Sequence, residues 1–232
     1  MKDKLPEIEV LYEDNHVIVI NKKASDIVQG DKTGDITLPD RIKEFLKVKY
    51  DKPGNVFCGV VHRLDRPTSG VVLFAKTSKA LARLNEQFRT KDTRKIYWAV
   101  VESAPPRNEA TLTDFLVKNE KQNKSYVCDG GKAGAKKAVL SYVKIADSDR
   151  YSLLEVSLET GRHHQIRAQL SAIGAIIKGD VKYGAKRSNP DGSIHLHARE
   201  LTFQHPTTKE QISITAPVPE DPLWKWFEKQ LS

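Results

Sequence analysis

The feature of this sequence that most limits its fold is a series of short apolar runs rich in β-branched residues. Residues 17–20, 71–75 and 96–101 are such runs. Runs of this length indicate strands that are buried on both faces. In the second half of the chain, alternating apolar and polar residues predict further strands. These later segments are residues 138–143, 154–158, 194–198, 201–203 and 211–215.

Helical periodicity is confined to three segments. It predicts one helix over residues 38–49 and a second that begins at Thr77 or Ser78 and runs to Phe88. A third helix is predicted over about residues 163–173, with Gly174 at its C-terminal cap. Strands in series with irregularly interspersed helices are typical of an α+β domain with a mixed, largely antiparallel sheet.

The size and composition of the chain suit one folded domain. It has 232 residues, of which 39% are hydrophobic and 29% are charged, so we expect a single domain over residues 1–232. Neither a signal peptide nor an apolar stretch of about 18 residues is present. The two cysteines, Cys58 and Cys128, are too few for a disulfide framework. These features predict a cytoplasmic protein, and a monomer is the expected state.

The net charge of +8 favours a polyanionic partner such as nucleic acid. Basic residues concentrate in three segments, residues 83–95, 118–137 and 178–187, which can converge on one groove. We interpret residues 118–137 as a basic loop or insertion between strands. Charge alone does not identify the partner, because many basic proteins bind nothing in particular.

A polar segment over residues 59–70 lies between apolar stretches and leads into a predicted strand. Asp65 stands between Arg63 and Arg66, and positive charge on both sides favours the ionised carboxylate. Asp65 is therefore suited to act as a nucleophile or a base rather than as an acid. The alternative is a salt-bridged loop in which Thr68 and Ser69 cap a turn.

A second polar segment, residues 159–167, follows a predicted strand and enters the third predicted helix. Backbone N–H groups and basic side chains at a helix start are suited to binding phosphate or carboxylate. Arg167 lies one position beyond the apolar Ile166, so its guanidinium can reach the edge of the core and meet a carboxylate bidentately. Asp65 is the candidate partner. The alternative is a solvated arginine at the start of a surface helix.

A third segment follows the basic pair Arg94-Lys95 and places Tyr97 and Trp98 on opposite faces of a predicted strand. One ring can pack inward while the other lines a cleft, where stacking on a base is worth about 1 to 3 kcal/mol. The alternative is that both rings belong to the core. His195 and His197 share a face of a predicted strand, but no carboxylate or cysteine spacing completes a metal-ligand set.

The sequence resembles the RluA family of pseudouridine synthases in three motifs that stand in the family's order. They are His62-Arg63-Leu64-Asp65 with Thr68-Ser69-Gly70, then Lys95-Ile96-Tyr97, then Gly161-Arg162-His163-His164-Gln165-Ile166-Arg167. The resemblance begins in residues 10–21 and extends through Leu196-His197-Ala198 to Ala216-Pro217, so it covers nearly the whole chain.

This resemblance implies an enzyme that isomerises uridines of ribosomal or transfer RNA to pseudouridine. The implied fold is a mixed, mainly antiparallel bent sheet with flanking helices and a central cleft. Asp65 is implied to be the catalytic aspartate, Tyr97 to pack on the target uracil, and Arg167 to pair with the aspartate. Arg63 is implied to hold the base out of its stack. The other implied substrate-binding residues are His62, Leu64, Thr68, Ser69, Gly70, Arg162, His164 and Gln165. The partner is RNA, and no cofactor, metal or membrane is expected.

The sequence departs from the family in three places. The family often has an N-terminal S4-type RNA-binding domain, but the first strand is predicted near Val10, so no S4 domain is expected. The early Asn-Lys-Pro-x-Gly motif is replaced by Asn21-Lys22-Lys23-Ala24-Ser25. His163 stands where the family more often has Thr or Ser.

Pseudouridine formation requires a uridine to be taken from its stack and enclosed. The sequence leaves open whether Asp65 first adds to the ribose or takes a proton from it. Two other functions are also open, a non-catalytic RNA-binding module and a nucleic-acid hydrolase. A glycosylase would release free uracil and a nuclease would shorten the strand, whereas a synthase leaves the mass of the RNA unchanged.

Overall fold

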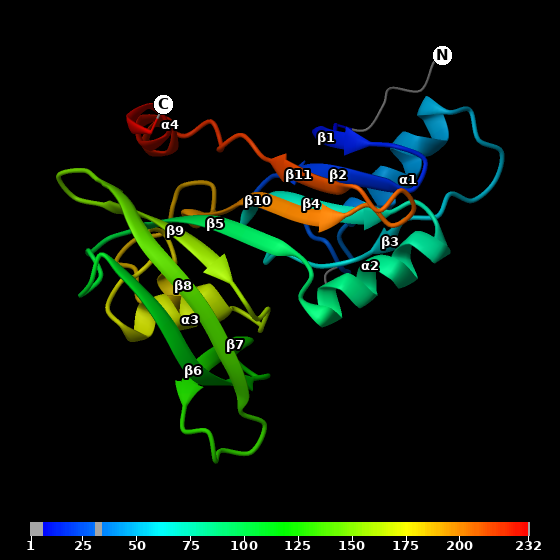
Figure 1. Ribbon diagram of the computed structural model, residues 1–232. Helices are drawn as coiled ribbons and strands as arrows, with labels where there is room; N and C mark the ends of the chain where they lie inside the picture. Colours follow the sequence, from blue (N-terminus) through cyan, green and yellow to red (C-terminus); the bar gives the residue numbers. More distant parts are fainter. Residues whose placement is uncertain (1–6, 31–33, 232) are drawn as a thin grey trace. The chain divides into compact units, whose positions relative to one another are not determined.

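A computed structural model describes residues 7–30 and 34–231 (Figure 1). The chain divides into two compact units. The first unit comprises Met1–Thr93 and Glu200–Pro217, and the second comprises Arg94–Arg199 and Val218–Ser232.

The first unit is built on antiparallel strands. β1 (Val10–Glu13) pairs with β2 (Val17–Lys22), and β2 pairs with β4 (Ser69–Ala75). The short β3 (Gly59–Val60) also pairs with β4. β11 (Gln211–Thr215) pairs with β10 (Leu196–Gln204), whose residues from Glu200 onward belong to this unit.

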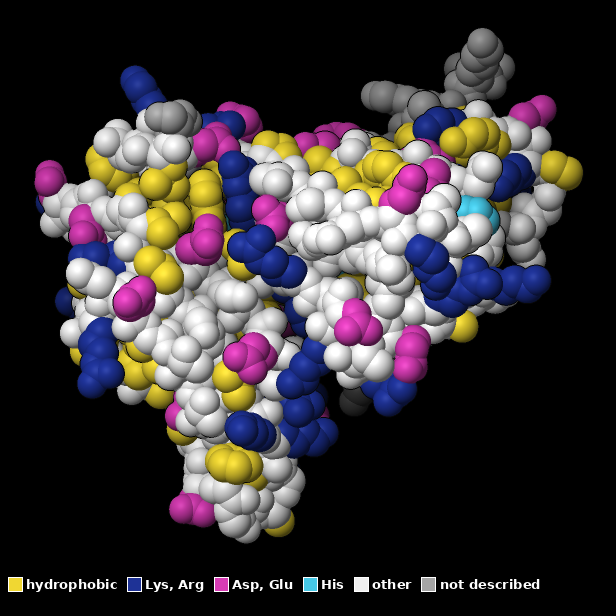
Figure 2. Space-filling model, in the orientation of Figure 1, with side chains coloured by type: hydrophobic (Ala, Val, Ile, Leu, Met, Phe, Trp, Pro, Cys, Tyr) yellow, Lys and Arg dark blue, Asp and Glu magenta, His cyan; other side chains and the backbone are white. Residues whose placement is uncertain are grey.

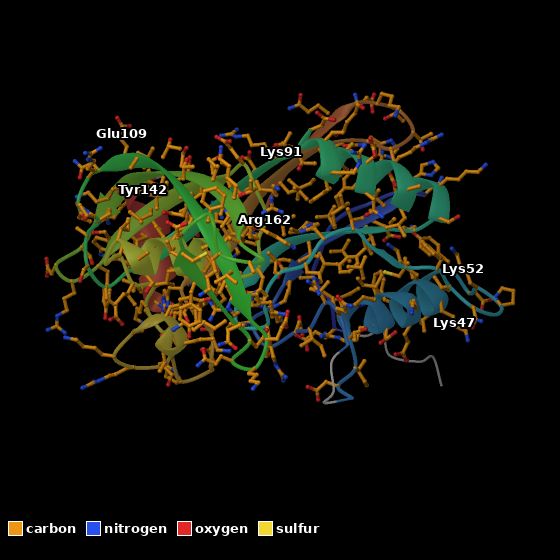
Figure 3. All side chains as sticks on the ribbon, turned by 90° about the horizontal axis from the view of Figure 1, so that it is seen from below. Lys47, Lys52, Lys91, Glu109, Tyr142 and Arg162 are labelled. Atoms are coloured by element: carbon orange, nitrogen blue, oxygen red, sulfur yellow. The ribbon has the colours of Figure 1, made fainter. Side chains whose placement is uncertain are left out.

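The two helices of the first unit begin at side-chain caps. α1 (Leu38–Lys49) has a capping box in which the Thr37 hydroxyl accepts from the backbone N–H of Asp40. α2 (Ser78–Thr90) begins after Thr77, whose hydroxyl accepts from Ala80 N at 3.1 Å. Figure 3 shows α1 and α2 on opposite sides of the strands of this unit. Both helices therefore begin where the sequence predicts.

The core of the first unit lies on both faces of β2 and β4. On one face, Val19 and Leu73 pack with Leu84 of α2. Ile18 and Ile20 alternate with these residues along β2, point to the other face, and are equally buried. Burial on both faces explains why these strands have continuous apolar runs instead of alternation.

The second unit contains a longer antiparallel series. Its strands are β5 (Arg94–Val101), β6 (Glu109–Asn119), β7 (Lys124–Cys128), β8 (Lys136–Asp147) and β9 (Ser152–Leu158). They run in the order β5-β9-β8-β6-β7. The helical elements are α3 (Gln165–Ala172), the 3₁₀ helix η1 (Val181–Tyr183) and α4 (Pro222–Gln230).

Two apolar clusters hold the helices of the second unit in place. Trp224 and Phe227 of α4 pack against Trp98 of β5 and its neighbours. Tyr183 of η1 packs with Ala168 of α3 and with residues of β6 and β8. Among the described residues, the second cluster contains only four that are buried, and polar contacts such as those of Tyr183 with His164 and Ser171 also hold α3 and η1 together.

The expected α+β class and mainly antiparallel sheet are confirmed, whereas some of the predicted elements are wrong. Residues 118–137 are not simply a loop, because they include β7 and the ends of β6 and β8. These strands pair through their backbones, which basic side chains on exposed positions do not prevent. α4 was not predicted from the sequence. The third helix is shorter than predicted, although Gly174 closes it with φ of 81°.

Three further expectations concern the chain as a whole. That residues 1–232 form a single domain without an S4 domain stays a prediction, as do the bend of the sheet and the central cleft. Among the described residues, no helix has the length and apolar character needed to traverse a bilayer.

Candidate active site

Asp65 lies on the loop that joins β3 to β4 in the first unit. Its carbonyl oxygen accepts from the backbone N–H of Thr68 at 3.0 Å, which closes a tight turn. Nε2 of His62 accepts from Leu73 N at 3.0 Å, and the His62 ring stacks on Phe88 with centroids 4.9 Å apart. The loop is thus attached to β4 on one side and to α2 on the other.

The same loop is held by Lys22, which lies at the end of β2 and is fully buried (0% exposed). Its ammonium donates to the carbonyl oxygens of Lys23 at 2.9 Å, Arg66 at 3.1 Å and Thr68 at 2.7 Å. An ammonium has three N–H donors, so each of them has an acceptor. Two of these acceptors, Arg66 and Thr68, follow closely after Asp65, and the turn that bears the carboxylate is therefore fixed by a cation from the interior.

The charge of Lys22 also acts on Asp65. Burial lowers the pKa of Lys22 to about 8, while attraction by the carboxylates of Asp26 and Asp65 opposes that fall. Lys22 is thus protonated at neutral pH, and its ammonium attracts Asp65 from a site that water does not screen.

That Arg63 and Arg66 favour the ionised carboxylate of Asp65 stays a prediction. In the structure, the guanidinium of Arg63 donates to Gln29, and that of Arg66 donates to Asp35 at 3.1 Å. Lys22 was missed as a site residue. A signal was present, because Lys22 continues the alternation of Ile18 and Ile20 and therefore belongs to a buried face.

Several residues of the motif around Asp65 are buried, whereas Arg66 directly after it is exposed. Ser69 and Thr68 are both buried, and Leu64 is at the edge of the core. The Thr68 hydroxyl oxygen has no hydrogen-bond partner within the described ranges. A buried hydroxyl without a partner is costly, and contact of Thr68 with the nucleotide stays a prediction. Gly70 has φ of 113°, which a residue with a side chain rarely adopts.

In the second unit, β5 places Tyr97 and Trp98 on opposite faces of the strand, as predicted. Tyr97 stands opposite Val156 of β9, and Trp98 stands opposite Glu155. Both rings are 8% exposed. The Trp98 ring packs in the α4 cluster and lies 4.4 Å from the guanidinium carbon of Arg199. Both residues are thus buried, as the alternative of two core rings requires, and contact of Tyr97 with uracil stays a prediction.

Arg167 is buried on α3 and forms a bidentate ion pair. Its Nε lies 2.7 Å from Oδ2 of Asp180, and its Nη2 lies 2.8 Å from Oδ1. Arg167 is 5% exposed and Asp180 is 1% exposed, so the alternative of a solvated surface arginine is wrong. The predicted bidentate carboxylate is present, but it belongs to Asp180, which the sequence analysis missed. Pairing of Arg167 with Asp65 stays a prediction.

Three of the predicted substrate-binding residues shape the turn before α3. Oε1 of Gln165 accepts from the Thr160 hydroxyl at 2.8 Å and from Arg162 N at 2.9 Å, and its Nε2 donates to Val139 O at 3.1 Å. Nε of Arg162 donates to Lys137 O at 3.0 Å. His164 precedes the helix with φ of 53°. These contacts are structural, and contact of the three residues with substrate stays a prediction.

Two of the three basic segments lie together in the second unit. The ammonium of Lys182 donates to the carbonyl oxygens of Gln122 and Asn123, in the turn between β6 and β7. Lys124 lies 4.8 Å from the ring centroid of Tyr183. Exposed lysines surround this hairpin at Lys118, Lys121, Lys132, Lys136 and Lys137. Figure 2 shows Lys and Arg side chains gathered on this part of the surface. Such a cluster favours a phosphate backbone.

No group of three or more His, Cys, Asp and Glu side chains in residues 7–30 and 34–231 is placed to hold a metal ion. His195 and His197 instead contact the ring of Trp224, with centroid distances of 5.2 and 5.9 Å. His195 also binds Asp221 through Nε2 at 3.2 Å. The two histidines thus fasten α4.

Comparison with known proteins places these residues in a family. The RNA pseudouridylate synthase family matches residues 16–172, a range that contains Asp65, Tyr97 and Arg167. The chain belongs to the RNA pseudouridylate synthase family. This confirms the resemblance drawn from the motifs and makes the chain an RNA-modifying isomerase. The roles of individual residues stay predictions.

Related proteins agree with this membership. The chain is 35% identical, over 92% of its length, to an uncharacterized RNA pseudouridine synthase of Chlorobaculum parvum, and it covers 72% of that protein. It is 34% identical, over 92% of its length, to ribosomal large subunit pseudouridine synthase D of Zymomonas mobilis, of which it covers 70%. The solved structure of human RNA Pseudouridylate Synthase Domain Containing 4 has a TM-score of 0.79 at 24% identity, covering 96% of this chain and 93% of the human chain. The last comparison shows that the fold is shared.

Proposed function

We propose that this synthase isomerises uridine in ribosomal RNA of the large subunit and that Asp65 performs the chemistry. The observation that carries the proposal is the family match over residues 16–172, which includes the Asp65 loop and Arg167. Relatives from Zymomonas mobilis and Vibrio parahaemolyticus are named ribosomal large subunit pseudouridine synthases D and C. Their names favour ribosomal RNA over transfer RNA as the substrate.

The reaction rearranges one nucleotide without changing its mass. The bond between ribose C1′ and uracil N1 breaks, the uracil rotates, and a bond forms between C1′ and C5. C5 loses its proton and N1 gains one, so the product has the atoms of the substrate. The base must leave its stack before these steps and must stay enclosed between them.

Asp65 is proposed to start the reaction as an ionised carboxylate, either by adding to the ribose or by taking a ribose proton. Both roles need a carboxylate that is charged and fixed in place. The buried ammonium of Lys22 supports the second requirement, because it binds the carbonyl oxygens of Arg66 and Thr68 in the turn that bears Asp65.

Tyr97 is proposed to pack on the uracil and to help remove the C5 proton after the new bond has formed. Arg167 is proposed to pair with Asp65 and to keep it aligned. The remaining motif residues, with Arg63 as the residue that keeps the base out of its stack, are proposed to bind the nucleotide. The lysines around the β6–β7 hairpin are proposed to bind the phosphate backbone. The protein is further proposed to be a monomer, to reside in the cytoplasm and to need no obligate protein partner.

The test is to map pseudouridine in total RNA from a host that lacks this protein and from the same host after the protein is supplied. A pseudouridine in large-subunit ribosomal RNA that depends on the protein is the expected result. A new position only in transfer RNA would overturn the substrate assignment. Free uracil or shortened RNA would indicate a hydrolase, and no modification of any RNA would indicate a binding module.

A further inference from the structure

We propose that Asp180 is a positioning residue for the reaction, which sets the orientation of the Arg167 guanidinium together with Tyr183. The inference rests on the proposed function, because Asp180 would act only through Arg167. It assigns a mechanistic role to a turn, residues 179–185, that lies outside the three motifs.

Asp180 fixes one edge of the guanidinium. Its two carboxylate oxygens bind Nε and Nη2 of Arg167 at 2.7 and 2.8 Å, and both side chains are almost fully buried. Two parallel hydrogen bonds to a planar group allow one orientation in the plane. The Nε–Nη2 edge of the guanidinium is thus occupied by Asp180, and the direction of the whole planar group is set by this carboxylate.

Tyr183 fixes the plane of the guanidinium. The guanidinium carbon of Arg167 lies 5.0 Å from the Tyr183 ring centroid. The ring cannot rotate freely, because its hydroxyl accepts from Ser125 N at 2.9 Å and donates to Ser125 O at 3.0 Å. Nδ1 of His164 is a third partner of the hydroxyl, at 3.0 Å. Tyr183 is thus attached to β7 and to the residue that precedes α3.

The backbone that bears Asp180 and Tyr183 is itself a tight turn. The carbonyl oxygen of Asp180 accepts from Tyr183 N at 2.9 Å and from Ala185 N at 3.1 Å. Gly179 has φ of 85°, and a Cβ at this position would lie 2.7 Å from Nδ2 of Asn189. Only glycine fits there. Both groups that orient Arg167 therefore come from one rigid segment.

Stability alone does not explain this ion pair. Removing two charges from water costs about as much as their attraction returns, and apolar side chains of the same volume are often equally stable. Arg167 stands at the position that the family resemblance assigns to the partner of the catalytic aspartate. A buried carboxylate that fixes its direction meets the need for a catalytic group to be held within about 0.5 Å of its working place.

The experiment measures kcat and KM of Asp180→Asn for pseudouridine formation on the RNA that the native protein modifies. Asp180→Asn removes the charge and one acceptor. Asp180→Glu keeps the charge but moves it by one methylene. Asp221→Asn is the matched control, since Asp221 caps α4 and binds buried His195 in the same unit. Each melting temperature is measured to show the folded fraction.

We expect Asp180→Asn to lower kcat about 100-fold and Asp180→Glu about 10-fold, with KM for RNA within about threefold, because a displacement of about 1 Å can cost two orders of magnitude. Asp221→Asn should lower the melting temperature and leave kcat unchanged. In an Arg167→Lys background, Asp180→Asn should have no further effect on kcat, since the residue acts through Arg167.

Three results would overturn the inference. The first is native activity in folded Asp180→Asn, and the second is an undiminished loss in the Arg167→Lys background. If Asp180→Asn does not fold, Asp180→Glu is the variant that tests the inference. The third result that would overturn it is a kcat of Asp180→Glu within threefold of the native value. A native protein that forms no pseudouridine overturns the proposed function itself, which separates that failure from this one.

Discussion

The ammonium of Lys22 lies 2.7 Å from the carbonyl oxygen of Thr68, three residues after Asp65. This contact joins the end of a central strand to the loop that bears the proposed catalytic carboxylate. It belongs to a set of three carbonyl oxygens around one buried cation. The position of Asp65 therefore depends on a residue 43 positions earlier in the chain.

The buried lysine predicts a pH dependence of stability. The pKa of Lys22 is about 8 in the folded chain, below its usual value of 10.5, so the unfolded chain holds more protons between these values. The free energy of unfolding of the native protein should therefore rise as the pH rises from 8 to 10.5, by at most about 3 kcal/mol. Lys22→Met should lack this contribution. Urea denaturation of both proteins from pH 7.5 to 10.5 measures the difference, and parallel curves would contradict the account.

The Thr68 hydroxyl predicts a separation of activity from stability. Its oxygen has no partner within the described ranges, so Thr68→Val should leave the free energy of unfolding unchanged or raise it by up to about 1 kcal/mol. If the hydroxyl binds the nucleotide, kcat/KM should fall at least about 10-fold, the loss of one hydrogen bond to a substrate.

Thr93→Val is the matched control for this change. Thr93 also has a buried hydroxyl without a partner within the described ranges, and it lies outside the motifs. Its replacement should leave both stability and activity unchanged. Full activity of Thr68→Val would show that this hydroxyl has no part in substrate binding.

The lysines around the β6–β7 hairpin predict a salt-dependent effect on RNA binding. Replacing Lys121, Lys132 and Lys136 together by Ala should raise KM for RNA and leave kcat at saturation unchanged. Each lost phosphate contact should lower the slope of log affinity against log salt by about 0.7 to 0.9. Binding measured from 50 to 300 mM salt gives that slope.

Three exposed lysines of the first unit form the control. Lys47 and Lys52, labelled in Figure 3, lie on α1 and just after it, and Lys79 lies on α2 outside the basic segments, so their joint replacement removes the same charge. We expect this triple variant to keep the native salt slope. Equal loss in both triple variants would mean that net charge, rather than the hairpin, determines the affinity.

Much of the fold could be predicted from local patterns. Residues 17–20 and 71–75 are short apolar runs because β2 and β4 are buried on both faces, and this burial is visible in the sequence. β7 was missed because it is only five residues long and lies within a basic, Gly-rich stretch, and Tyr126 and Val127 are exposed. Its backbone pairs with β6 along the whole strand, and an apolar run of three residues is too short to indicate this pairing.

Some residues of the candidate site could likewise be predicted from the sequence, and others could not. The Asp65 and Arg167 segments are recognisable because their residues are contiguous. The partners that hold them are distant in the chain, as Lys22 is from Thr68, or follow after an irregular segment, as Asp180 follows Arg167. Sequence spacing carries no direct record of such contacts, since the turn at Gly179 and the end of β2 create them only when the chain folds.

The central claim is that Asp65 performs the chemistry, and its most direct test is release of tritium from RNA labelled at uridine C5. The native protein and Asp65→Asn are compared on RNA from a host that lacks this protein, with RNA binding measured in parallel. The account predicts release by the native protein, none by Asp65→Asn, and affinities of the two proteins within severalfold of each other. Tritium release by Asp65→Asn at the native rate would contradict it.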